Sequence, residues 1–220
     1  MHGWGGNLNS LNIVKDEFKN RMCISVDFFG HGNTKEPEKE SSIFDEAENV
    51  VKILRELKVY NCDVVAHSYG VRIALIIASY YPSLISKMVL FGPAGLKAKK
   101  SLRVRLSILR YKRLAKKYAG DSVKLSKLGK MGSEEYVALS PQMKHLFKSA
   151  VNTDLSKHAK IIKAKTLIIC GENDTATTPK MAKRLHKLIK FSTLKIVKNS
   201  GHYVFLDGIE AVKLAYFYLN

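Results

Sequence analysis

The stretch Ala66-His67-Ser68-Tyr69-Gly70 decides the fold of this chain of 220 residues. Residues 62–66, directly before the serine turn, are short and β-branched, which predicts a buried strand. Residues 71–81 are apolar on nearly every side and precede Pro82, which predicts a buried helix. A serine on such a turn holds its hydroxyl out of the sheet, and small residues two positions away relieve the crowded backbone. Taken alone, the pattern fits a nucleophile and an ordinary loop serine equally well.

Strands and helices alternate along most of the chain. Ser42 is predicted to cap a helix, with Asp45 completing a capping box. The buried stripe of that helix is Ala47, Val50, Val51, Leu54 and Leu57. Further strands are expected at 22–27, 87–91, 166–170 and 193–197, and further helices at 179–189 and 209–219. This alternation predicts an α/β fold, with a mostly parallel sheet covered by helices on both faces.

The composition is that of an ordinary globular domain, apart from its charge. The chain has an apolar fraction of 46% and three cysteines, Cys23, Cys62 and Cys170, all in expected strands. We interpret them as small buried side chains in a reducing compartment, which favours the cytoplasm. No apolar run is long enough to span a membrane, and the first residues do not resemble a signal peptide.

The formal net charge of +18 would favour anionic partners. Because lysines are spread over the whole chain and no nucleic-acid motif accompanies them, we do not expect specific nucleic-acid binding. Residues 97–130 are the most basic part, with Asp121 as their single acid. Residues 97–158 are predicted to form a helical insertion, a cap between two core segments, 1–96 and 159–220. This basic cap could attract anionic surfaces weakly.

A serine, an acid and a histidine each follow an expected strand, in the order Ser68, Asp174, His202. Functional loops of parallel sheets lie at the carboxyl ends of the strands, so these side chains should meet. An imidazole can take the proton of a serine hydroxyl, and a carboxylate can orient the imidazole. Glu172 is the only nearby rival of Asp174, and it sits earlier in its turn. His31 and His67 are expected to make structural hydrogen bonds, and no cluster has metal-ligand spacing.

These residues resemble those of the α/β-hydrolase superfamily, specifically its small serine hydrolases with a helical cap. The matching pieces cover the chain from end to end: His2-Gly3-Trp4-Gly5-Gly6, Asp27-Phe28-Phe29-Gly30-His31-Gly32, Ala66-His67-Ser68-Tyr69-Gly70, Gly171-Glu172-Asn173-Asp174 and Ser200-Gly201-His202. The order Ser…Asp…His is also the one typical of that superfamily.

The resemblance implies a hydrolase of carboxylic esters, thioesters or similar acyl compounds, with no cofactor. Ser68 would be the nucleophile, with His202 as proton shuttle and Asp174 as its orienting partner. The oxyanion would be held by the backbone N–H groups of Trp4 and Tyr69. A serine at the nucleophile position argues against relatives that use aspartate there. Two alternatives stay open: carbon–carbon bond hydrolysis by the same triad, and a non-catalytic binding module. The identity of the acyl substrate and the oligomeric state are not readable from the sequence.

The chain departs from the superfamily pattern at its start. The His-Gly loop normally follows the third strand, but here it begins at His2, so Met1 stands where that strand should end. The segment 22–27 is therefore expected either to pair with the strand at 62–66 or to stand apart from it. The simplest account is an internal methionine of a longer protein, and the alternative is a genuine short form. We expect the 220-residue chain to be less stable and less active than an extended one.

Overall fold

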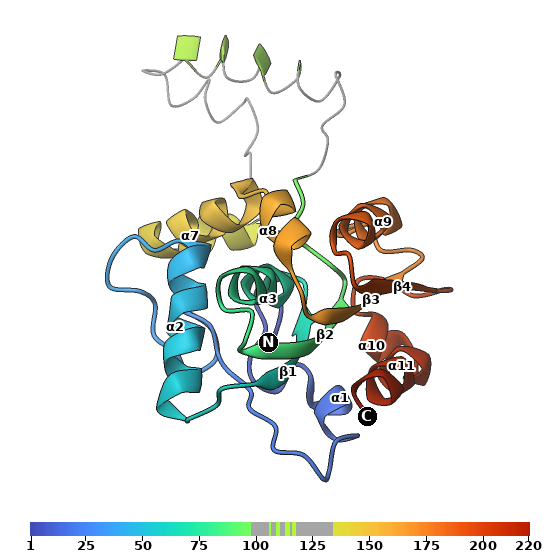
Figure 1. Cartoon of the computed structure of the whole chain (residues 1–220). Helices are drawn as coiled ribbons and strands as arrows, with labels where there is room; N and C mark the ends of the chain where they lie inside the picture. The colour runs from blue at the N-terminus through green and yellow to red at the C-terminus, as the bar shows by residue number, and fades with distance from the viewer. Residues whose placement is uncertain (98–105, 107–108, 111–112, 115, 118–133) are drawn as a thin grey trace.

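The computed structural model describes residues 1–97 and 134–220, together with 106, 109, 110, 113, 114, 116 and 117 (Figure 1). Its centre is a four-stranded parallel sheet in the order β1-β2-β3-β4. The strands are β1 (Cys62–His67), β2 (Ile85–Phe91), β3 (Lys165–Gly171) and β4 (Ser192–Val197). This confirms the predicted α/β class and the strands expected at 62–66, 87–91, 166–170 and 193–197.

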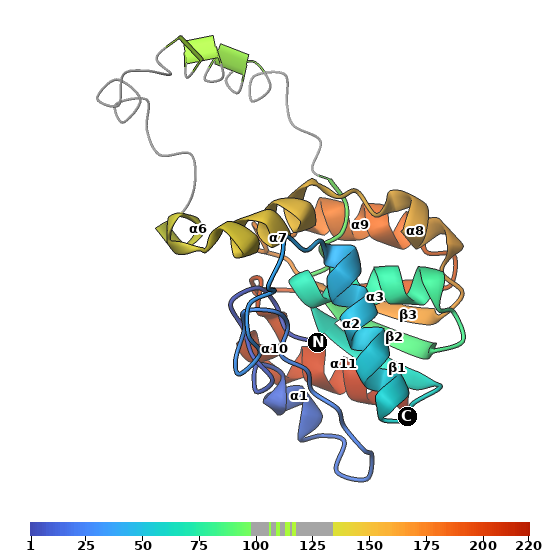
Figure 2. The ribbon, with the colours of Figure 1, turned by 90° about the vertical axis from the view of Figure 1, so that its left-hand side faces the viewer.

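Helices cover both faces of the sheet (Figures 1 and 2). One face carries α2 (Ile43–Glu56), α3 (Tyr69–Tyr80), α8 (Ser156–Ile161) and α9 (Pro179–Leu188). The other face carries α1 (Asn12–Lys15), α10 (Val204–Asp207) and α11 (Ile209–Leu219). Two apolar cores result, one under each layer of helices. No helix within the described ranges is long and apolar enough to cross a membrane.

The structure confirms the capping box predicted for α2 and the burial predicted for α3. Ser42 forms the predicted capping box with Asp45, whose carboxylate accepts the Ser42 N–H at 2.8 Å. Leu57 differs from the prediction, because it is the C-terminal cap of α2 and is half exposed. Helix α3 is buried over most of its length, as its all-round apolar sequence predicts.

The strand predicted at 22–27 is wrong. Residues 22–28 have no regular secondary structure, and β1 forms an edge of the sheet. Ladder hydrogen bonds need a neighbouring strand in register, and no strand of the described sheet lies on that side of β1. The burial expected for the cysteines holds for Cys170 alone, since Cys62 is half-buried and Cys23 is exposed.

Met1 lies beside the carboxyl end of β1, on the free edge of that strand. Its ammonium donates to Val65 O at 2.9 Å, and its carbonyl accepts the N–H of His67 at 3.0 Å. The His2 carbonyl then accepts the N–H of Gly70 at 3.0 Å. The start of the chain is therefore anchored to β1 and to the first turn of α3.

Most of the predicted helical insertion lies outside the described residues. Its described part contains α6 (Glu134–Ala138), α7 (Pro141–Asn152) and the first residues of α8. Pro141 begins α7, at the first helical position where proline is well placed, and Ser140 caps the helix by accepting the N–H of Met143 at 3.1 Å. The boundary predicted after residue 158 falls inside α8, which packs on α3 and α9.

Candidate active site

Ser68 lies on a strained turn at the carboxyl end of β1. Its backbone has φ 47° and ψ −105°, which L-residues other than glycine rarely adopt. Its N–H donates to Phe91 O at 3.1 Å, so the turn is fixed to the end of β2. The two neighbours of Ser68 are buried, whereas Ser68 itself is half-buried. The turn therefore presents a serine hydroxyl above the sheet at the amino end of α3.

Asp174 and His202 form a hydrogen-bonded pair beyond the ends of β3 and β4. Nδ1 of His202 lies 2.9 Å from Oδ2 of Asp174, and the carboxylate side chain is fully buried. A carboxylate can only accept, so Nδ1 carries the proton and Nε2 is left as a base. Burial raises the pKa of Asp174, but hydrogen bonds from His202 and Thr177 outweigh it, so the pKa is lowered. The pair therefore keeps an ionised carboxylate behind a half-buried imidazole.

His67 joins the serine turn to the histidine loop. Its Nε2 donates to the backbone carbonyl of His202 at 3.1 Å, and the two rings lie 4.8 Å apart. Burial and the neighbouring imidazole lower the pKa of His67 to about 4, so it stays neutral. Within the described residues no hydrogen bond joins Ser68 Oγ to His202 directly. The structure thus brings Asp174 and His202 into contact. Ser68 directly follows His67, whose side chain binds the backbone carbonyl of His202.

The loop with the expected oxyanion donor Trp4 lies against the serine turn. Gly3 packs so closely that an added Cβ would stand 2.8 Å from Nδ1 of His67, with Cβ of Ser68 at 3.5 Å. The ring of Trp4 contacts the ring of Tyr69 at 5.3 Å, edge to face. In this loop His2 accepts the N–H of Phe28 at 3.2 Å through Nε2. Trp4 and Tyr69, the two expected donors, are therefore neighbours beside Ser68.

Glu46 is a fully buried carboxylate next to this loop, and no local pattern in the sequence marks it as a site residue. Both of its oxygens lie 3.2 Å from the N–H of Phe29, and the Tyr69 hydroxyl donates to Oε2 at 3.4 Å. Burial raises the pKa of Glu46 to about 7. It links α2 to the segment after residue 27 and to the residue that follows Ser68.

Thr177 is a second site residue that sequence reasoning missed. Its hydroxyl donates to Asp174 Oδ2 at 2.8 Å, and its N–H donates to Asp174 Oδ1 at 2.8 Å. The Ala176 N–H also donates to Oδ1, at 2.9 Å. The signal was present, because an aspartate followed by small and hydroxyl residues is typical of a turn closed by the aspartate side chain.

Replacement of Gly171 by alanine should damage both the site and the fold. An added Cβ would collide with the backbone carbonyl oxygens of Ser200 and Gly201, directly before His202. We expect Gly171→Ala to lower the free energy of unfolding by about 1–3 kcal/mol. Because His202 would be displaced, turnover by a site that uses this imidazole should fall about 100-fold. Urea unfolding and turnover measure the two effects.

Gly208→Ala is the matched control, since nothing lies within 4 Å of its added Cβ and its φ of 176° is extended backbone. Equal behaviour of the two variants would contradict the close approach at Gly171.

Glu46 should make the stability depend on pH. Its pKa rises from 4.5 in the unfolded chain to about 7 in the folded one, so the folded state binds more protons between these values. The stabilisation is complete below pH 4.5 and is lost as the pH rises towards 7. Relative to wild type, Glu46→Gln should therefore gain at most about 3 kcal/mol of unfolding free energy between pH 4.5 and 8. Urea unfolding at both pH values tests this, and a constant difference between the two proteins would contradict it.

Comparison with known proteins gives a family and a set of similar structures. The sequence profile described as "Alpha/beta hydrolase family" matches residues 1–213. The Bacillus subtilis "AB hydrolase superfamily protein YisY" is 25% identical over 234 residues, covering 96% of this chain and 87% of the relative. An esterase from Exiguobacterium antarcticum has a TM-score of 0.74 at 23% identity, covering 100% of this chain and 90% of that one. The meta-cleavage product hydrolase of Pseudomonas fluorescens IP01 has a TM-score of 0.71 at 18% identity, covering 99% and 88%.

The fold is a parallel sheet with helices on both faces. An alcohol, an acid and an imidazole lie at the carboxyl ends of its strands, as is typical of α/β enzymes. The profile match covers nearly the whole sequence. The chain belongs to the α/β-hydrolase family.

Proposed function

We propose that this chain is a serine hydrolase that cleaves a carboxylic ester or a related acyl bond. The observation that carries the proposal is the strained Ser68 turn tied by His67 to the loop of the Asp174–His202 pair. Family membership supports it, as does the similarity to the esterase from Exiguobacterium antarcticum. A cytoplasmic location stays a prediction from the cysteine content.

The proposed reaction uses this chain's own groups. Ser68 Oγ attacks the carbonyl carbon while Nε2 of His202 takes its proton. The negative oxygen of the tetrahedral intermediate accepts hydrogen bonds from the N–H groups of Trp4 and Tyr69. The imidazolium gives its proton to the leaving alcohol, and water then releases the acyl group from Ser68 by the same steps. Asp174 stabilises the imidazolium throughout.

We further propose that residues 97–158 cover this site as a cap. Phe147 of α7 supports this, because its ring lies 5.1 Å from that of Trp4. The basic residues expected to attract anionic surfaces lie mostly outside the described residues, so that attraction also stays a prediction.

A fluorophosphonate probe and a series of p-nitrophenyl esters of graded acyl length test the proposal. Labelling of Ser68, located by peptide mass spectrometry, together with ester turnover is the expected result. A folded chain that is neither labelled nor active would instead support a non-catalytic binding module.

Carbon–carbon hydrolysis is the second candidate, favoured by the similarity to a meta-cleavage product hydrolase. Labelling of Ser68 with cleavage of a meta-cleavage product, but of no ester, would support that candidate.

A further inference from the structure

The N–H groups of Trp4 and Tyr69, the two expected oxyanion donors, have no protein acceptor in the described part of the chain. The N–H groups of Ser68 and Gly70, on either side of Tyr69, both donate to backbone carbonyls. Tyr69 is buried, and a buried N–H without an acceptor is rare in proteins. The directions of these two donors therefore depend on how the residues around them are held.

Glu46 holds Tyr69 through its hydroxyl group. The carboxylate is fully buried on α2, and its Oε2 accepts the Tyr69 hydroxyl at 3.4 Å. Between this hydrogen bond and the backbone, the Tyr69 ring contacts the rings of Trp4 and Phe28, edge to face, with centroids 5.3 Å away in each case. The residue that follows Ser68 is therefore fixed at both ends, by the turn and by Glu46.

The same carboxylate reaches Trp4 through two further residues. Both oxygens of Glu46 lie 3.2 Å from the N–H of Phe29. The carbonyl of Phe29 accepts a hydrogen bond from Nδ1 of His31 at 2.7 Å. The ring of His31 in turn contacts the ring of Trp4 at 4.9 Å, edge to face. One buried group thus supports both residues that are expected to bind the oxyanion.

A carboxylate is a costly side chain at this position. Burial raises the pKa of Glu46 to about 7, because the ionised form loses its hydration there. Leucine would avoid that cost, but it would leave the Phe29 N–H and the Tyr69 hydroxyl without this acceptor. The two hydrogen bonds therefore distinguish Glu46 from an ordinary core residue of α2.

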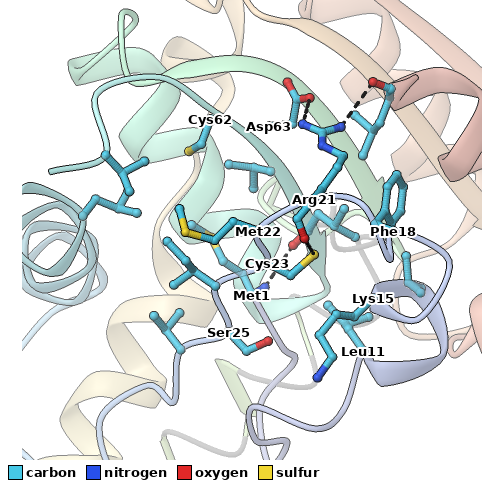
Figure 3. Close-up of a pocket in the computed structure, with 18 of the residues that line it drawn as sticks. Met1, Leu11, Lys15, Phe18, Arg21, Met22, Cys23, Ser25, Cys62 and Asp63 are labelled. Carbon is cyan, nitrogen blue, oxygen red and sulfur yellow. Dashed lines mark hydrogen bonds and ion pairs between the residues drawn. The ribbon is translucent and has the colours of Figure 1, made fainter. Parts of the chain in front are cut away.

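Helix α2 uses a different part of its buried face to line a groove beside β1. Val50 and Leu54, about one and two turns after Glu46, belong to the lining of this groove of about 410 Å³ (Figure 3). Glu46, Phe29 and Tyr69 do not line it. A change at Glu46 should therefore act on the serine turn and leave the groove as it is.

We propose that Glu46 is a positioning residue that sets the directions of both oxyanion donors, through the Tyr69 hydroxyl and through Phe29. The proposal rests on the proposed function, because an oxyanion forms only if Ser68 attacks a carbonyl carbon. Preorganised donors lower the barrier because they already point to the place where negative charge develops. A small displacement of these donors therefore slows the reaction without weakening the binding of the substrate.

A second tyrosine–glutamate pair joins the same two helices and supplies a matched control. Tyr81 directly follows α3, and its hydroxyl donates to Oε1 of Glu48 on α2 at 2.7 Å. This pair lies at the end of α3 opposite Ser68. Tyr81→Phe removes the same chemical group as Tyr69→Phe, so it should leave turnover unchanged.

The test uses three variants of the network. Tyr69→Phe keeps the ring and removes the hydroxyl, Glu46→Leu removes both acceptors, and Glu46→Gln keeps an acceptor for the Phe29 N–H. The kcat and KM are measured above the pKa of Glu46, with the p-nitrophenyl ester that wild type cleaves fastest. The inhibition constant of a trifluoromethyl ketone is measured as well, because its adduct with a serine carries an oxyanion. Circular dichroism at rising temperature checks that each variant is folded.

We expect kcat to fall at least about fivefold in Tyr69→Phe and at least about 20-fold in Glu46→Leu, with KM within about twofold of wild type. The inhibition constant should rise by the same factor as kcat falls. Glu46→Gln should keep more of the kcat than Glu46→Leu, and Tyr81→Phe should match wild type. A purely structural role would lower the melting temperature without this split between kcat and KM.

The proposal is overturned if Tyr69→Phe keeps the kcat and the inhibition constant of wild type, and this variant carries the test if Glu46→Leu does not fold. Equal losses of kcat in Tyr69→Phe and Tyr81→Phe would overturn it too. The proposed function fails in a different way. Wild type would then turn over no ester and take no fluorophosphonate label at Ser68, and the role of Glu46 would fall with it.

Discussion

Ser68→Ala is expected to lower ester turnover about a million-fold while the protein stays folded. The hydroxyl is the proposed nucleophile, and without it the proposed acyl intermediate on Ser68 cannot form. Alanine keeps the turn of φ 47°, and a half-buried hydroxyl adds little to stability, so the free energy of unfolding should change by less than about 0.5 kcal/mol. Steady-state turnover of a p-nitrophenyl ester and urea unfolding measure the two quantities.

Ser79→Ala is the matched control for this variant. Ser79 lies near the C-terminal end of α3, the helix that begins directly after Ser68, and its hydroxyl donates to Ile76 O at 2.8 Å. It should keep full turnover. Retention of more than a tenth of the turnover by Ser68→Ala would remove the serine from the mechanism.

Asp174→Asn is expected to lower kcat about ten-thousand-fold. The asparagine oxygen can still accept the N–H groups of Ala176 and Thr177, so the turn should persist. The amide nitrogen would then face Nδ1 of His202 and favour the tautomer with the proton on Nε2, where it cannot act as a base. The charge that stabilises the imidazolium is lost as well.

Glu172→Gln is the control, because it is the rival acid of the same turn. Glu172 is exposed, and its Oε2 accepts the N–H of Asn199 at 3.3 Å. Its turnover should stay within a few-fold of wild type, measured under the same conditions. The reverse result, a large loss for Glu172→Gln and a small one for Asp174→Asn, would transfer the orienting role to Glu172.

The sequence allowed the prediction of features that depend on neighbouring residues. The turn at Ser68 follows from a β-branched stretch, two small residues and an apolar helix within 20 positions. The capping box of Ser42 is equally local, and the structure contains it. The meeting of Asp174 with His202 was predictable because loops at the carboxyl ends of parallel strands gather at one edge.

Other features could not be predicted, because they depend on contacts distant in sequence. The segment 22–27 has the composition of a strand, but a strand also needs a partner beside it, and β1 ends the described sheet. Cys23 is exposed for the same reason. The role of His67 depends on a carbonyl 135 residues away, which no local pattern encodes. Glu46 was hidden because a glutamate on a helix is usually solvated.

The consecutive order of the strands has a consequence for synthesis on the ribosome. Each of β2, β3 and β4 adds beside the strand made before it, so the sheet can grow in one direction as the chain emerges. The proposed partner of Ser68 comes last, since His202 follows β4, and α11 covers β2 and β3 only after that. A nascent chain therefore displays Ser68 long before it contains His202, the proposed base, so the proposed site is complete only after β4 has been made.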